Sequence, residues 1–253
     1  MLLNVHAGEN VGVFIKGSSM AEIGGLVRAL REGDDAAKAA AAGALGDLVR
    51  DCDTEQHRKR VRIREAGGIP PLVQLVRDGS AEAKTQAAAA LANLTLTYIE
   101  VTNRRLVGAA GATSPLIELL RDGSAEAKLW AASALRNLAC ENDNKMLITE
   151  AGGVPLFVQL LRDGCAKGKL KASAALSSLA LNNDAGAVAV AVAVGLEALV
   201  ELARHGRVIA NEQWLVWSAG VPAKRKAALV VAALLDRDGR LPREIKALIG
   251  AYL

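Results

Sequence analysis

Asn93 and Asn137 occupy the same place in an internal repeat, 14 residues after Gly79 and Gly123. A carboxamide carries both a hydrogen-bond donor and an acceptor, so it can pair with a peptide group whatever side chain that peptide bears. Trp130 stands seven residues before Asn137, and tryptophan is enriched among the residues that anchor protein partners. These residue types suit hydrogen bonding and apolar contact, and they do not form a catalytic group by themselves.

Residues that could support catalysis or metal binding form no recognisable pattern. The three histidines, His6, His57 and His205, belong to no metalloprotease or triad motif, and the sequence contains no phosphate loop or dinucleotide fingerprint. Cys52 and His57 lie close to carboxylates within 51–57, but the spacing differs from that of a zinc site. We therefore expect a protein that is not an enzyme, with no catalytic residue, no metal and no cofactor.

The composition predicts a soluble helical chain. Hydrophobic residues make up 51% of the 253 residues but aromatic residues only 3%, so good helix formers such as Ala and Leu dominate. The net charge of +4 is too mild to indicate nucleic-acid binding, and the longest uncharged apolar run, 185–196, is too short to span a bilayer. Three scattered cysteines and the lack of a signal-peptide pattern predict a cytoplasmic location, with the nucleus as an alternative.

The octapeptide RDGSAEAK occurs at 77–84 and again at 121–128. Its arginine suits the last turn of a helix, its glycine suits a left-handed residue just past the end, and Ser80 or Ser124 suits the cap of a following helix. Each copy therefore predicts a tight corner between two helices. Related octapeptides occupy 31–38 and 162–169, and the aligned glycines, 46, 44, 41 and 42 residues apart, are Gly33, Gly79, Gly123, Gly164 and Gly206.

Each repeat reads as a short helix, a medium helix that ends at the aligned glycine, and a longer Ala-rich helix. Prolines fall in the first turn of the medium helices, where a missing N–H costs little. The alternating segment 185–194 also fits a strand, but its register in the repeat favours a short helix. In the long helices, apolar residues at positions i, i+4 and i+7 predict a buried stripe. Its members are Ala41, Ala87, Ala131, Ala172, Leu45, Leu91, Leu135, Leu176, Leu48, Leu94, Leu138 and Leu179.

The motif GG-[IV]-P-x-L-[VF]-x-L-[LV]-R-D-G followed by A-x-x-A-L-x-N-L resembles the armadillo repeat over about residues 20–206. Two-helix HEAT repeats are the competing assignment, but the extra short helix and the GG-x-P entry disfavour them. The resemblance implies an all-α fold, a right-handed α-solenoid of four clear repeats plus a divergent C-terminal capping repeat. We expect a degenerate N-terminal segment at 1–20 (a worn first helix), the repeat array at 21–206 and the cap at 207–253.

In armadillo proteins the third helices line a concave groove, where a ladder of asparagines holds the backbone of an extended partner. By this resemblance Asn93 and Asn137 fall on ladder positions, and Asp47 and Ser178 replace asparagine at the ends. Positions seven and ten after the aligned glycine share the same helix face. The predicted partner-binding residues are Asn93, Asn137, Trp130, Gln86, Ser133, Lys171, Ser178 and Asp47.

Importin-alpha-like cargo receptors carry tryptophan four residues before each ladder asparagine, where this chain has Ala89 and Ser133. The resemblance therefore favours a vacuolar-armadillo/catenin-like protein, a non-catalytic scaffold that binds a protein or peptide. The segment 241–253 is similar to the opening helix of an F-box, so a ubiquitin-ligase adaptor is the alternative function and a cargo receptor the third choice; by default the segment is a capping helix. We expect a monomer that binds no nucleic acid and has no membrane span.

Two groups of basic residues have a simpler interpretation. QHRKRVRIRE at 56–65 falls on a predicted short helix, where a solvated face is expected and a nuclear-import signal is the alternative. Lysines five residues after the aligned glycines are expected to form a solvated rim. They are Lys38, Lys84, Lys128 and Lys169.

Overall fold

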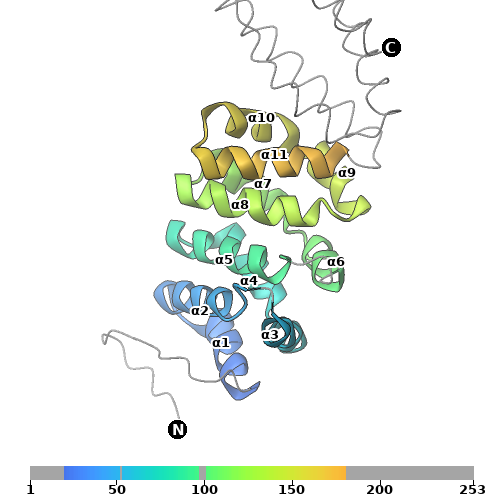
Figure 1. The fold of residues 1–253 in the computed structure, drawn as a ribbon. Coiled ribbons are helices and arrows are strands. Elements are labelled where there is room, and N and C mark those ends of the chain that lie inside the picture. Colours follow the sequence, from blue (N-terminus) through green and yellow to red (C-terminus); the bar gives the residue numbers. More distant parts are fainter. Residues whose placement is uncertain (1–19, 52, 97–100, 181–253) are drawn as a thin grey trace, which may run out of the picture.

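The computed structural model describes residues 20–51, 53–96 and 101–180, which form helices joined by short turns (Figure 1). The N-terminal segment before residue 20, the predicted helix at 185–194 and the predicted cap at 207–253 lie outside these residues. The helices are α1 Met20–Glu32, α2 Asp35–Asp47, α3 Thr54–Glu65, α4 Ile69–Asp78, α5 Ala81–Leu94, α6 Val101–Ala109, α7 Thr113–Asp122, α8 Ala125–Leu138, α9 Asn142–Glu150, α10 Gly153–Asp163 and α11 Ala166–Ala180.

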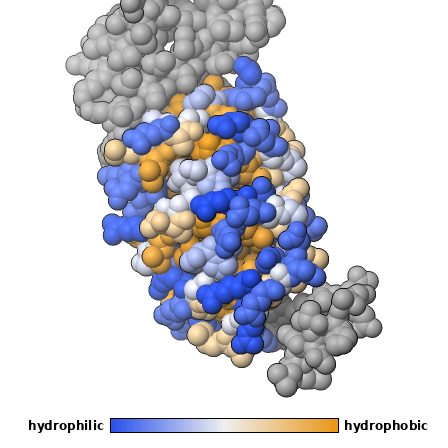
Figure 2. Space-filling view, turned by 180° about the vertical axis from the view of Figure 1, so that it is seen from behind, coloured by the Kyte–Doolittle hydropathy of each residue, from blue (hydrophilic) through white to orange (hydrophobic). Residues whose placement is uncertain are grey.

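The helices stack in series, repeat upon repeat. The long helices α2, α5, α8 and α11 lie side by side in one layer (Figure 1), and each packs against the medium helix before it, α1, α4, α7 or α10. The short helices α3, α6 and α9 contact the medium helices of neighbouring repeats. Seen from behind (Figure 2), hydrophilic and hydrophobic residues are mixed over the surface. The described part of the chain is an all-α repeat solenoid of about four repeats, as predicted.

The core lies where the long helices meet the medium helices. Every residue of the predicted stripe is buried, and Leu91, Leu135 and Leu176 have no exposed surface. α2 and α5 approach closely, because a Cβ on Gly46 would lie 3.2 Å from the Cα of Ala90. The small residues thus set a narrow spacing between adjacent long helices.

The corner between medium and long helices forms where the octapeptide predicted it. Ser80 and Ser124 accept hydrogen bonds from the N–H groups of Ala83 and Ala127, at 3.3 and 3.1 Å. The prediction of a left-handed glycine here is wrong, since Gly123 has φ −70° and ψ 169°. Glycine is needed at this corner for space, because a Cβ would lie 2.5 Å from the carbonyl oxygen of Leu119.

Left-handed glycines occur at a different corner, between each short helix and the medium helix that follows. The first glycine of the GG-x-P entry, or its equivalent, has a positive φ in three repeats. A residue without Cβ adopts this conformation at little cost, and the chain then turns directly into the next helix. These glycines are Gly67 (φ 73°), Gly111 (φ 76°) and Gly152 (φ 78°).

Candidate functional site

One face of each long helix points away from its leucine stripe. Positions seven, ten and fourteen after the aligned glycine lie on this face, about 160–220° around the helix from the stripe at position twelve. Because the long helices lie side by side, these positions form one surface, which we call the third-helix face. Its residues are Ala40, Gly43, Asp47, Gln86, Ala89, Asn93, Trp130, Ser133, Asn137, Lys171, Ala174 and Ser178.

Asn93 and Asn137 join adjacent long helices. Asn93 Nδ2 donates to the carbonyl oxygen of Gly46 at 3.1 Å, and Asn137 Nδ2 donates to that of Ala92 at 2.9 Å. The two asparagines are only 7% and 5% exposed. The expectation of amides turned toward an open hollow is therefore corrected, because the narrow helix spacing brings each amide onto its neighbour's backbone. Their role as peptide ligands remains a prediction.

The residues that replace asparagine at the two ends make only local bonds. Ser178 Oγ donates to the carbonyl oxygen of Ala174 in its own helix at 3.0 Å. Asp47 is exposed and accepts a hydrogen bond from the Arg50 guanidinium, three residues away. Of the four ladder positions, the two central ones thus bond to an adjacent long helix, and Asp47 and Ser178 do not.

Trp130, Ser133 and Lys171 meet where α8 faces α11. Lys171 Nζ lies 5.8 Å from the centre of the half-buried Trp130 ring and donates to Ser133 Oγ. Trp130 Nε1 donates to Glu126 Oε1 at 3.4 Å. An ammonium over an aromatic face is attracted by the ring's quadrupole. The structure therefore brings together three of the predicted site residues from two repeats.

Gln86 belongs to the neighbouring pair of long helices. Its Oε1 atom lies 3.1 Å from the place that a Cβ on Gly43 would occupy, so it packs over the glycine of α2. Ala89 is half-buried beside it. Gly43, Gln86 and Ala89 carry no charge, unlike the residues around Trp130.

Sequence reasoning missed Arg60, which lies in the basic run at 56–65. Arg60 is fully buried, so the prediction of a solvated face is wrong for this residue. Its guanidinium donates to the carbonyl oxygens of Asn93 (3.0 Å), Val49 (2.7 Å) and Asp51. Since the last carbonyls of a helix have no partner within it, Arg60 satisfies the ends of two long helices at once.

A repeated position could have revealed this role. Arg60, Arg104 and Lys145 each stand three residues before the buried apolar residue of a short helix, and all three are buried. Arg104 Nε donates to Glu141 Oε1 at 2.9 Å. Burial lowers the pKa of Lys145, although nearby Cys140 and Glu141 act in the opposite direction. A basic residue at this position is therefore a structural element of the repeat.

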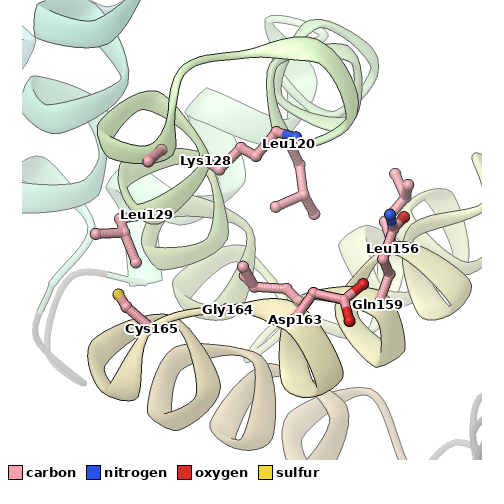
Figure 3. Close-up of a pocket in the computed structure, with 10 residues that line it drawn as sticks. Leu120, Lys128, Leu129, Leu156, Gln159, Asp163, Gly164 and Cys165 are labelled. Carbon is pink, nitrogen blue, oxygen red and sulfur yellow. The ribbon is translucent and has the colours of Figure 1, made fainter.

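A pocket lies away from the third-helix face, at the corner between repeats three and four. Figure 3 shows Lys128 and Leu129 of α8 on one side and Leu156, Gln159 and Asp163 of α10 on the other. Leucines line the pocket together with the charged residues Lys128 and Asp163. The remaining lining residues are Leu120, Ala125, Leu160, Gly164 and Cys165.

Neither a metal site nor a membrane helix emerges from the part of the chain that the structure covers. Within residues 20–51, 53–96 and 101–180, no three His, Cys, Asp or Glu side chains come together as metal ligands would. None of the helices in these ranges combines the length and apolarity needed to cross a bilayer.

Comparison with known proteins agrees with the fold. Residues 57–96 and 141–181 match the family model described as armadillo/beta-catenin-like repeat. A designed armadillo repeat protein, YIII(Dq.V1)4CPAF, in complex with the peptide (KR)4 is 26% identical, with a TM-score of 0.63 over 83% of this chain and 82% of that chain. Computationally designed armadillo repeat proteins for modular peptide recognition are 26% identical, with a TM-score of 0.62 over 84% and 82%.

An engineered protein of solved structure is 25% identical and has a TM-score of 0.64, over 92% of this chain and 95% of that chain. No curated protein matches the chain. The two matched segments fall in different repeats of one solenoid, and the similar structures share that solenoid. The chain is therefore similar to armadillo repeat proteins in these two segments and in its fold, with no subfamily assigned.

Proposed function

We propose that the chain is a non-catalytic binding protein that holds an extended segment of a partner protein along the third-helix face. The observation that carries this proposal is the half-buried Trp130 ring at the junction of α8 and α11, with Ser133 and Lys171 beside it. A rigid aromatic side chain in such a position can anchor a partner at low entropic cost. A structurally similar designed protein binds the peptide (KR)4, which supports the same use of the fold here.

The size of the face suits a short segment. Four long helices about 10 Å apart span about 40 Å, and an extended chain advances about 3.3 Å per residue, so about 12 residues would fit. Asn93 and Asn137 each use Nδ2 to bond a neighbouring carbonyl, and each carboxamide oxygen can accept a hydrogen bond from a partner's N–H group. In this proposal the two asparagines hold the partner backbone, and Gln86, Asp47 and Ser178 complete the contact surface.

The branch of the family belongs to the proposal as well. Importin-alpha-like proteins carry a tryptophan four residues before the ladder asparagine, and this chain has Ala89 and Ser133 there. This difference favours a catenin-like over an importin-like protein. The adaptor alternative rests on 241–253, which lies outside the described residues.

The test is a selection of random 12-residue peptides on the immobilised full-length chain, followed by affinity measurements with variants. Trp130→Ala should lower the affinity for the selected peptides by about tenfold or more, because an aromatic anchor is lost. Leu147→Ala, which removes an exposed apolar side chain of α9, is the matched control and should leave binding unchanged. Peptides that respond to Leu147→Ala and not to Trp130→Ala would place binding on another surface and refute the proposal.

A further inference from the structure

The first turn of the long helix carries opposite charges in different repeats. The octapeptides of repeats two and three place Glu82 and Glu126 in the first turns of α5 and α8, whereas the related octapeptide of repeat four, RDGCAKGK, places Lys167 in the first turn of α11. All three side chains are exposed. The backbone corner is alike in repeats three and four, where Gly123 and Gly164 have similar φ and ψ. Besides the change of charge, Cys165 replaces the capping serine and Gly168 replaces an alanine.

Lys167 does not stabilise the helix that contains it. The first turn of a helix attracts negative charge, and a lysine there opposes the helix dipole. Lys171 lies four residues later on the same helix face, where two like charges repel each other. A residue whose charge disfavours its own helix, with no compensating contact, is expected at functional sites.

Three cations approach one another where α8 meets α11. Lys171 is held against Trp130 and Ser133, Lys167 lies one helical turn before it, and Arg136 is exposed on α8. Burial lowers the pKa of Lys171, and the positive charges of Arg136 and Lys167 lower it further. Among the described residues, none of these three side chains forms an ion pair. We call Trp130, Arg136, Lys167 and Lys171 the basic cluster.

We propose that the basic cluster binds an acidic stretch of the extended partner segment, with aspartate or glutamate carboxylates at the three cations and an apolar neighbour against Trp130. This inference rests on the proposed function and adds the chemical class of the partner. Carboxylates would supply the missing counter-charge through charge-assisted hydrogen bonds. An acidic peptide fits better than a nucleic acid, because Glu82 and Asp47 farther along the surface would repel a continuous phosphate backbone.

The experiment measures fluorescence anisotropy of labelled peptides with the full-length chain. The probes are a 12-residue peptide of Gly, Ser and Leu that ends in four glutamates, the same peptide ending in four serines or four lysines, and a 12-nucleotide single-stranded DNA. We expect the glutamate peptide to bind at least about tenfold more tightly than the serine peptide.

Lys167→Glu should abolish this preference, and it restores the residue type that repeats two and three carry, so the fold should be retained. A thermal melt by circular dichroism checks that the variant is folded. Lys169→Glu makes the same charge change at an exposed position two residues away and should preserve the preference.

Several outcomes overturn the inference. The inference is wrong if the lysine peptide or the DNA binds more tightly than the glutamate peptide. It is also wrong if Lys167→Glu keeps the preference for glutamate, or if the glutamate peptide shows no measurable binding. If the three peptides bind equally and all weaken in Trp130→Ala, the acidic preference is refuted while the proposed function stands. If peptides selected from a random library are indifferent to Trp130→Ala as well, the proposed function fails too.

Discussion

Two regions of the third-helix face use polar residues differently. Between α2, α5 and α8, Asn93 and Asn137 are buried and bond to the backbone of the preceding long helix. Between α8 and α11, Lys167 and Arg136 are exposed, and Lys171 is half-buried beside Trp130. The comparison teaches that neighbouring long helices can be joined by buried polar groups at one junction and keep polar groups accessible at the next. We expect the first region to respond to mutation mainly in stability and the second mainly in binding.

The largest effect is expected at Arg60, which connects the ends of α2 and α5. Arg60→Ala would remove this donor from three carbonyl groups, of which those of Val49 and Asn93 belong to buried residues, and we expect a loss of at least about 3 kcal/mol in the free energy of unfolding. Urea denaturation followed by circular dichroism measures it.

The matched control is Arg58→Ala in the same helix. Arg58 is exposed and pairs with Glu55, so its removal should change stability by less than about 0.5 kcal/mol. Equal effects of the two substitutions would show that burial of Arg60 is not what matters.

A smaller loss is expected at the ladder asparagines. Asn137→Ala removes the hydrogen bonds to the carbonyl oxygen of Ala92 and to Thr95 Oγ1, at 2.9 and 3.4 Å, and should cost about 1–3 kcal/mol. Ser178→Ala at the equivalent position of α11 should be nearly neutral, because Ser178 bonds only within its own helix. Thermal melts of both variants would contradict the comparison if Ser178→Ala proved the more harmful.

A substitution in the basic cluster should stabilise the protein, whereas the substitutions above destabilise it. Lys167→Glu places a negative charge in the first turn of α11 and four residues before Lys171, which should increase the free energy of unfolding by about 0.5–1 kcal/mol. A urea titration at low ionic strength measures this gain, and added salt should reduce it. A destabilised variant would mean that Lys167 has a structural role that the charges do not explain.

The smallest effect is a pH dependence from Lys171. Because burial and the neighbouring cations lower its pKa in the folded state below the ordinary 10.5, its protonated form opposes folding at pH values below the folded pKa. This penalty is lost as the pH rises through the lowered pKa toward 10.5. The stability of the wild type relative to Lys171→Met should therefore rise slightly in this alkaline window, as unfolding curves at several pH values would show. A difference that stays constant with pH would contradict this prediction.

Local chemistry made much of the fold predictable. The serine caps, the proline positions and the spacing of leucines such as Leu91 and Leu135 act within single helices, so the sequence pattern was sufficient. The conformation of Gly79, Gly123 and Gly164 was predicted wrongly, because the sequence shows that a side chain is excluded but not whether φ or space excludes it. The burial of Asn93 and Asn137 was not predicted, and the membership of the candidate site remains a prediction.

The sequence by itself determined the repeat period, the helices, their corners and the side of each long helix that is buried, because propensity, capping and apolar spacing operate over a few residues. Only the tertiary structure decided which polar groups bond to a neighbouring repeat. The reach of Asn93 to Gly46 and the burial of Arg60 depend on the distance between separate helices, which the close contact of Gly46 with Ala90 sets. That distance is a property of the packed stack, and no single helix encodes it.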